Sequence, residues 1–415
     1  MSSARHPLPL EQLPRKAPGH RPGLLRGTRV LDLTTSIAGP YGTMLLADFG
    51  AEVIKVERPG TGDDSRHWQP PMYAGHALWY LSVNRNKLSV TLDFSNEQGY
   101  AVLRRLVRQC DVLVTNQLPA VLAKLRIDYE SIKAVRPDIV YVSLTGFGLQ
   151  GDRKNDPCYD LVAEGYSGVM DLTGELANDP QKVGTPAADM LAGADAALGC
   201  LAALMDRART GNGHFVEVSL VDSMTRFLTP RIVSYLGSGE LPRRSGAKDS
   251  VIAVYQVFAT ADEPMTLALS NDAIWKRFCG TVARPDLAAD PSLATNAGRV
   301  TRRAELVQQI QQLLLAQPRA YWLTLFRQHK VPAGPINRVD EVVRDEELLA
   351  RGLFYAMENG EQPIPQVGLG IRFDGEAPGF ERVPPALGAD TDAVLGELAG
   401  LQAHEIDSYR KAGVI

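Results

Sequence analysis

The stretch TRVLDLTTSIAGPYGTMLLADFGAEVIKVE (residues 28–57) decides the fold class of this chain. Residues 30–33 form a short apolar strand, residues 41–49 have a helical pattern that ends at Gly50, and residues 52–57 form a second strand. A strand, a short helix and a strand in this order indicate a β-α-β unit, and therefore a parallel sheet. Further strands are expected at residues 89–92, 112–114, 139–142 and 215–218. The chain is thus predicted to be an α/β protein with a Rossmann-like large domain.

Composition excludes several classes of protein. The 415 residues carry a formal net charge of −4, with 45% hydrophobic and 22% charged residues, as in ordinary globular proteins. The negative charge argues against nonspecific nucleic-acid binding, and without an unbroken apolar run of about 18 residues no membrane span is expected. The four cysteines lack CxxC spacing and the seven histidines lack ligand spacing. We therefore expect a cytoplasmic protein with reduced thiols and no metal site.

Changes in composition divide the chain into four parts. Residues 1–22 are basic and rich in proline, and we expect a flexible leader there. Residues 23–225 form the first part of the large domain, and residues 226–344 form a smaller α+β domain with its linkers. A loose loop rich in glycine and basic residues is expected at 237–250. Residues 345–415 form a C-terminal segment with two helices, at 390–398 and 403–412.

The segment KVGTPAADM (residues 182–190) places one carboxylate, Asp189, at the start of a helix rich in alanine and glycine. That helix is expected to stop near Gly211 and Gly213, and its small residues allow neighbouring backbones to approach closely. Asp189 has two interpretations. It is either an N-cap whose carboxylate accepts backbone N–H groups, or a nucleophile.

Six ordered motifs resemble the class III CoA-transferases, and together they run from about residue 24 to the C-terminal AGVI. The motifs are LRGTRVLDLTTSIAGPYGTMLLADFGAEVIKVERPGTGDDSRHW (25–68), YLSVNRNKLSVTLDF (80–94), SLTGFG (143–148), YDLVAEGYSGVMDLTG (159–174), KVGTPAADM (182–190) and VPAGPINRVDEV (331–342). The resemblance implies the fold of that family. It also implies a large domain that binds CoA, a C-terminal segment that returns to this domain, and an interlocked homodimer.

The resemblance also implies roles for individual residues. Asp189 takes the position of the family's nucleophile, which forms an acyl anhydride and then a CoA thioester. The CoA thioester is then a substrate, and no permanently bound cofactor is expected; the turn SIAGPYG lacks the GxGxxG pattern of NAD sites. Positions that match the family's CoA contacts are Ile37, Ala38, Arg58, Leu92, Asp93, Asn116, Lys124 and Tyr159.

Some of these positions have simpler interpretations. Arg58 can be a solvated charge at a strand end, and Tyr159 can be a packing residue. Lys124 replaces an arginine of the family and loses its bidentate geometry. Tyr159 also stands where the related racemases have a histidine base. A tyrosine, with a pKa near 10, is poorly suited to abstract a proton at neutral pH, which favours CoA transfer.

The expected function is transfer of CoA from succinyl-CoA or a similar donor to a small dicarboxylic acid. The sequence departs from the family pattern at residues 116–120 and 245–256, which leaves the acceptor acid open. Arg243, Arg244 and Lys248 either meet the free carboxylate of a dicarboxylate or belong to a solvated loop. An acyl-CoA epimerase and a CoA-binding protein that has lost catalysis remain as alternatives. The expected partners are an acyl-CoA and a carboxylic acid, with no nucleic acid or membrane.

Overall fold

The computed structural model describes residues 9–19, 21–358 and 362–415, and it divides into two compact units. The first unit contains the described residues up to Val169, together with Val183–Ile232 and Val343–Ile415. The second contains Met170–Lys182 and Val233–Val342. Residues 170–182 therefore belong to the smaller unit, although their composition placed them in the large domain. The C-terminal segment belongs to the first unit.

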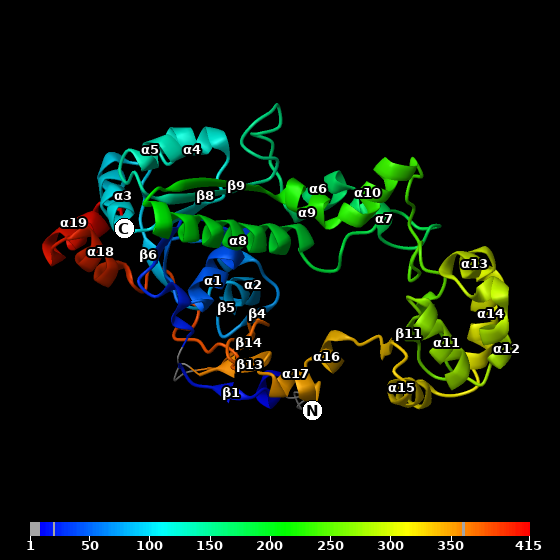
Figure 1. Cartoon of the computed structure of the whole chain (residues 1–415). Helices are drawn as coiled ribbons and strands as arrows, with labels where there is room; N and C mark the ends of the chain where they lie inside the picture. The colour runs from blue at the N-terminus through cyan, green and yellow to red at the C-terminus, as the bar shows by residue number, and fades with distance from the viewer. Residues whose placement is uncertain (1–8, 20, 359–361) are drawn as a thin grey trace. The chain divides into compact units, whose positions relative to one another are not determined.

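A six-stranded parallel sheet forms the centre of the first unit (Figure 1). Its strands lie in the order β6-β3-β2-β7-β8-β9, so the first strand of the sheet, β2, lies beside both β3 and β7. This is the Rossmann order, and it confirms the predicted α/β class. The strands are β2 (Arg29–Asp32), β3 (Glu52–Glu57), β6 (Lys87–Thr91), β7 (Val112–Thr115), β8 (Val140–Thr145) and β9 (His214–Ser219).

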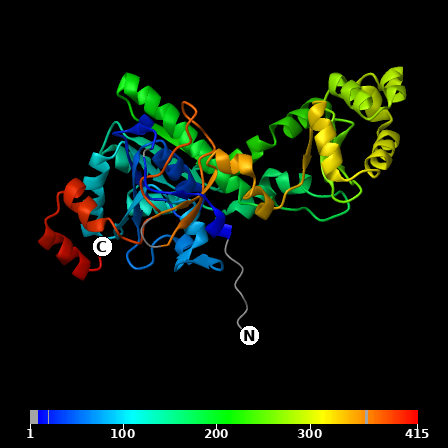
Figure 2. The same cartoon turned by 90° about the horizontal axis from the view of Figure 1, so that it is seen from below.

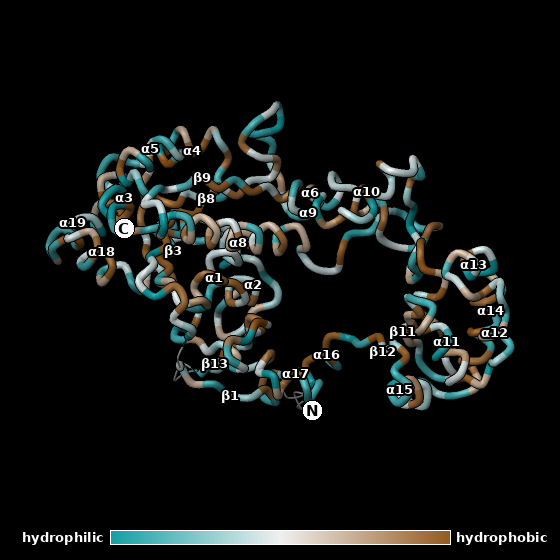
Figure 3. Tube along the Cα trace, viewed as in Figure 1, coloured by the Kyte–Doolittle hydropathy of each residue, from teal (hydrophilic) through white to brown (hydrophobic). Residues whose placement is uncertain are grey.

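Both faces of this sheet are covered, which explains why nearly every residue of β3, β7 and β8 is buried. Most residues of β8 are also hydrophobic (Figure 3). Leu31, Ile54 and Leu113 pack in one core with α3 (Glu97–Gln109), α18 (Thr391–Ala399) and α19 (Ala403–Lys411). In Figure 2 the C-terminal helices lie beside α3. The opposite face is covered by α1 (Ala38–Asp48) and α8 (Ala187–Thr210).

The described part of the expected leader is structured. In it, β1 (Arg15–Lys16) pairs in parallel with β13 (Phe354–Met357), which pairs with β14 (Ile364–Val367). Residues 1–8 and 20 lie outside the described residues. The other elements of the first unit are η1 (Pro9–Gln12), η2 (Gly23–Leu25), η3 (Asp64–His67), β4 (Met72–Tyr73), β5 (His76–Ala77), α2 (Leu78–Ser82), α4 (Pro119–Leu125), α5 (Tyr129–Lys133), α6 (Asp160–Ser167), α9 (Leu220–Phe227) and α17 (Glu346–Ala350).

The second unit has its own antiparallel sheet, β10-β11-β12, and its own core of buried residues that includes Trp275, Phe278 and Phe326. Its elements are β10 (Tyr255–Phe258), β11 (Met265–Ala268), α11 (Asp272–Thr281), α12 (Pro285–Ala289), η4 (Pro291–Leu293), α13 (Asn296–Thr301), α14 (Arg303–Leu314), α15 (Arg319–Gln328), β12 (Ala333–Pro335) and α16 (Val339–Val342). Two helices cross the boundaries between the units, α7 (Val169–Leu172) and α10 (Thr229–Ser238).

The backbones of α8 and α1 approach closely at Gly42 and Gly193. A β-carbon added at Gly193 would lie 2.4 Å from the carbonyl oxygen of Ala38, and one added at Gly42 would lie 2.7 Å from the carbonyl oxygen of Gly193. By length and composition alone α8 could cross a membrane. In this structure it covers the sheet, and its alanine-rich face is buried. It ends at Gly211, which adopts a left-handed conformation with φ 75°.

We expect Gly193→Ala to reduce the free energy of unfolding by about 1–3 kcal/mol, because the new methyl group must push α1 and α8 apart. Gly280→Ala is a matched control, since nothing lies within 4 Å of a β-carbon there and the site is also helical. Chemical denaturation followed by circular dichroism measures both. Equal stability of the two variants would contradict the close contact.

Candidate active site

A cavity opens where the strand order of the main sheet reverses. Strands β2 and β7 are neighbours, but the chain continues from β2 toward β3 and from β7 toward β8. The loops that follow them therefore separate, and the crevice between such loops is the usual ligand site of α/β sheets. Asn116 bridges the two loops here. Its Oδ1 accepts from Thr35 N at 3.0 Å and its Nδ2 donates to Thr35 O at 2.8 Å.

This cavity has a volume of about 200 Å³ and lies entirely within the first unit. Three of its walls come from the carboxyl ends of β2, β7 and β8, and a fourth from the start of α8. Its lining residues are Thr35, Ser36, Ala38, Asp64, Asn116, Leu118, Leu144, Thr145, Gly146, Pro157, Cys158, Tyr159, Asp189 and Leu220.

Asp189 lines this cavity from the first turn of α8. The residue before the helix is Pro186, so the interpretation of Asp189 as an N-cap is wrong. The carboxylate of Asp160 takes that role from a distant part of the chain. Its Oδ1 accepts from Ala188 N at 2.9 Å and from Asp189 N at 3.3 Å. The carboxylate of Asp189 is therefore left available to the cavity.

Burial, and then the nearby charge of Asp160, raise the pKa of Asp189 to about 7. Only 9% of the residue is exposed to solvent. A carboxylate that titrates near neutral pH is more basic than an ordinary aspartate, so it is a stronger nucleophile once it is ionised. Burial, followed by the charges of Asp189 and Asp160, also raises the pKa of Cys158 to about 11. That thiol is neutral at physiological pH.

A network of buried charges holds the loop on the β2 side of the cavity. Lys55 Nζ forms an ion pair with Asp63 Oδ2 at 2.7 Å and donates to Thr34 O at 2.8 Å. Asp63 Oδ1 accepts from Ser36 N at 3.0 Å. Ser36 has a φ of 70°, in the left-handed region that serine rarely adopts. The network therefore fixes a strained backbone next to the cavity.

Asp32 anchors the same loop from inside the sheet. Its Oδ1 accepts from Thr34 N at 3.0 Å and its Oδ2 pairs with Lys87 Nζ at 3.1 Å. Burial opposes ionisation of Asp32, but Lys87 and Lys55 outweigh it and hold its pKa well below the usual range. Burial also lowers the pKa of Lys87, to about 8.

The structure brings together four of the nine site residues expected from the sequence. Ala38, Asn116, Tyr159 and Asp189 line the cavity, with Tyr159 63% exposed. The other five do not line it. Ile37 and Leu92 are buried, Arg58 and Lys124 are exposed, and Asp93 accepts hydrogen bonds from Ser95 and Asn96. Their contacts with CoA remain predictions.

Several lining residues were not expected from the sequence. Thr145 is the last residue of β8, Gly146 follows it, and Asp64 lies in the segment after β3. Position at or beyond the carboxyl end of a parallel strand is therefore the signal that could have found them. The sequence gives no signal that Asp160 caps α8, because 28 residues separate it from Ala188.

Within the residues that the structure describes, no group of three or more His, Cys, Asp or Glu side chains could hold a metal ion.

The second unit has a separate cavity of about 590 Å³ that is lined by Arg244, Lys248 and Arg303, among others. Arg244 forms an ion pair with Asp171 at 2.9 Å. Arg243 does not line this cavity.

Comparison with known proteins identifies a family. The model of CoA-transferase family III matches residues 25–391. Succinyl-CoA:glutarate CoA-transferase from Mus musculus is 35% identical over 394 residues, covering 94% of this chain and 90% of its own. Succinate–glutarate CoA-transferase from Agrobacterium fabrum is 36% identical, covering 93% and 98%. Succinyl-CoA–D-citramalate CoA-transferase from Chloroflexus aurantiacus is 30% identical and covers 100% of both chains.

Solved structures agree with these matches. A CAIB/BAIF family protein from Brucella suis is 36% identical with a TM-score of 0.78, covering 90% of this chain and 99% of its own. The protein Rv3272 from Mycobacterium tuberculosis is 26% identical with a TM-score of 0.78, covering 88% and 98%. The chain therefore belongs to CoA-transferase family III.

Proposed function

We propose that this protein transfers CoA from succinyl-CoA, or a similar acyl-CoA, to a small dicarboxylic acid, with Asp189 as the nucleophile. The observation that carries the proposal is a buried carboxylate of raised pKa at the cavity where the sheet order reverses. The relatives reported above are named for transfer of CoA to glutarate or D-citramalate, which supports a dicarboxylate acceptor. We also propose that the protein is a cytoplasmic homodimer.

The reaction follows from the chemistry of one carboxylate. Asp189 attacks the thioester carbonyl, the CoA thiolate leaves, and an acyl–aspartyl anhydride forms. The thiolate attacks the aspartyl carbonyl, which releases the first acid and leaves CoA on Asp189 as a thioester. The acceptor carboxylate attacks this thioester and again expels the thiolate, forming a second anhydride. Attack of the thiolate on the acceptor's acyl carbon restores the Asp189 carboxylate.

The raised pKa of Asp189 makes the first step less unfavourable. An ordinary aspartate, with a pKa of about 3.9, is a much weaker base than the thiolate it must displace, whose thiol has a pKa of about 8.5. Burial brings the pKa of Asp189 to about 7, which removes about two thirds of that difference. The first turn of α8 also directs its backbone N–H groups toward this end of the helix, where they favour negative charge.

A direct assay tests the function. The protein is incubated with succinyl-CoA and, in turn, isotopically labelled glutarate, oxalate, citramalate or mesaconate, and CoA esters are identified by mass spectrometry. Labelled acyl-CoA without deuterium uptake at the α-carbon supports the proposal. Uptake of deuterium from solvent without transfer between acids would instead indicate an epimerase.

Asp189→Ala should abolish transfer while changing CoA affinity by less than about tenfold, because the nucleophile is lost and the rest of the cavity remains. Turnover is measured by the same assay and CoA binding by calorimetry. Asp206→Ala is the control, since Asp206 lies on the same helix and is absent from the cavity lining. Near-normal turnover of the Asp189 variant would contradict the assignment.

Asp189→Asn should stabilise the folded protein at alkaline pH. The folded-state pKa of about 7 exceeds the reference value of 3.8, so ionisation of Asp189 costs folding free energy. The folded state binds the extra proton between about pH 4 and 7, and stability falls as pH rises through that window. The difference corresponds to about 4 kcal/mol when fully expressed. Thermal unfolding at about pH 5 and about pH 8 should show the stabilisation of the variant growing with pH.

The dependence of kcat/KM on pH should show an acid limb near pH 7, because only ionised Asp189 can attack. Asp160→Asn should move this limb to lower pH. The substitution removes a negative charge that raises the pKa of Asp189 but keeps an oxygen that can cap α8. An unchanged limb in this variant would show that Asp160 does not influence the nucleophile.

A further inference from the structure

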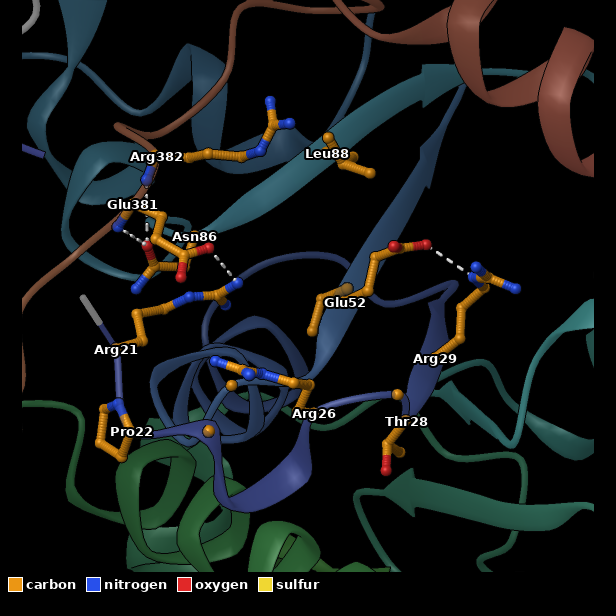
Figure 4. A pocket seen from close by; sticks show the side chains of 14 residues that line it. Arg21, Pro22, Arg26, Thr28, Arg29, Glu52, Asn86, Leu88, Glu381 and Arg382 are labelled. Carbon is orange, nitrogen blue, oxygen red and sulfur yellow. Dashed lines mark hydrogen bonds and ion pairs between the residues drawn. The ribbon is translucent and has the colours of Figure 1, made fainter. Parts of the chain in front are cut away.

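A second cavity of the first unit lies at the opposite end of the main sheet from Asp189. It has a volume of about 320 Å³. Its walls come from residues 21–29, the first residues of β3 and β6, and residues 381–382, as Figure 4 shows. The cavity with Asp189 lies at the opposite, carboxyl ends of strands β2, β7 and β8 of the same sheet. The two cavities therefore do not share a ligand.

Positive charge exceeds negative charge in this second cavity. Arg21, Arg26, Arg29 and Arg382 line it, against two acidic residues, Glu52 and Glu381. Arg29 is neutralised by Glu52, with Nε 2.6 Å from Oε1. Arg21 pairs with Glu381 at 2.6 Å.

Two guanidinium groups remain for a ligand. Across the described ranges of the chain, the Arg26 side chain has no hydrogen bond or ion pair. Among the described residues, the Arg382 side chain has only a long ion pair to Asp390, at 3.5 Å. In Figure 4 Arg382 and Arg26 lie on opposite sides of the cavity, and Arg21 lies between them on one side.

The arginines stand on a fixed backbone. Arg21 donates from Nη1 to Ala47 O at 2.6 Å and to Ala51 O at 3.1 Å. Its Nε is buried and makes no hydrogen bond within the part of the chain that the structure describes. On the other wall, Asn86 Oδ1 accepts from Glu381 N at 2.8 Å and from Arg382 N at 3.1 Å. A cluster of like charges on such a scaffold attracts anions.

We propose that this cavity binds a phosphate dianion through Arg26 and Arg382. The planar fork of a guanidinium matches two oxygens of a phosphate, and such charge-assisted pairs are among the strongest hydrogen bonds in proteins. The charge of a dianion equals the excess of the arginines over the glutamates. The ligand is either free phosphate or the phosphate monoester of a nucleotide.

The test is titration calorimetry of the full chain with inorganic phosphate, in a buffer without phosphate and with saturating CoA. The bound CoA fills the positions in the active site that could otherwise bind phosphate. We expect saturable binding that weakens as salt is added. Arg26→Gln and Arg382→Gln should each weaken it by about tenfold or more, since each removes a charge-assisted contact. Arg104→Gln, at an exposed arginine of α3 outside the cavity lining, should leave it unchanged.

Adenosine 3′,5′-bisphosphate distinguishes the two sources. If it binds more tightly than inorganic phosphate and still depends on Arg26, the ligand is a nucleotide; if more weakly, the ligand is free phosphate. The proposal is overturned if no saturable binding occurs at millimolar phosphate. It is also overturned if Arg58→Gln reduces binding while the Arg26 and Arg382 variants do not. CoA transfer is not used as a readout, so failure here leaves the proposed enzymatic function intact.

Discussion

The active-site cavity depends on two buried ion pairs, Asp32 with Lys87 and Lys55 with Asp63. All four side chains are fully buried, so the cost of removing them from water is large and their net contribution to stability is small. The effect of these ion pairs is to hold the loop after β2 in place. Lys55 and Asp63 bind the backbone of Thr34 and Ser36, and this loop would otherwise relax from its left-handed conformation. One wall of the cavity is thereby fixed before a substrate enters.

The position of the opposite wall is set by two glycines, which have no side chain to separate α1 from α8. Gly42 and Gly193 let α1 and α8 approach closely, which sets the position of the first turn of α8 and of Asp189 on it. Asp160 accepts hydrogen bonds from backbone N–H groups at the start of α8, so the carboxylate of Asp189 is not needed to cap the helix. The result is a carboxylate that is costly to ionise and therefore reactive. Ionisation of Asp189 lowers the free energy of unfolding, and Asp189 is the residue at which the reaction is expected.

Much of the fold could be predicted from the sequence, because its signals are local. The β-α-β unit of residues 28–57 follows from two apolar strands and a helix that ends at Gly50, and the end of α8 follows from Gly211. The site could be predicted only in part. The cap by Asp160 and the bridge from Asn116 to Thr35 join residues far apart in the chain, and composition carries no signal of such contacts. Lys55 and Lys87 are charged residues inside strands, which pattern reading places at the surface.

The first unit is discontinuous, and this affects the order in which the chain can fold during synthesis. The face of the sheet that carries Leu31 and Ile54 is closed by α18 and α19, and Asp93 N donates to Val414 O at 2.7 Å. A ribosome delivers these last residues only after the entire second unit has been made. Until then α3 covers only part of this apolar face, so a nascent chain at this stage exposes hydrophobic residues that a holdase chaperone could bind.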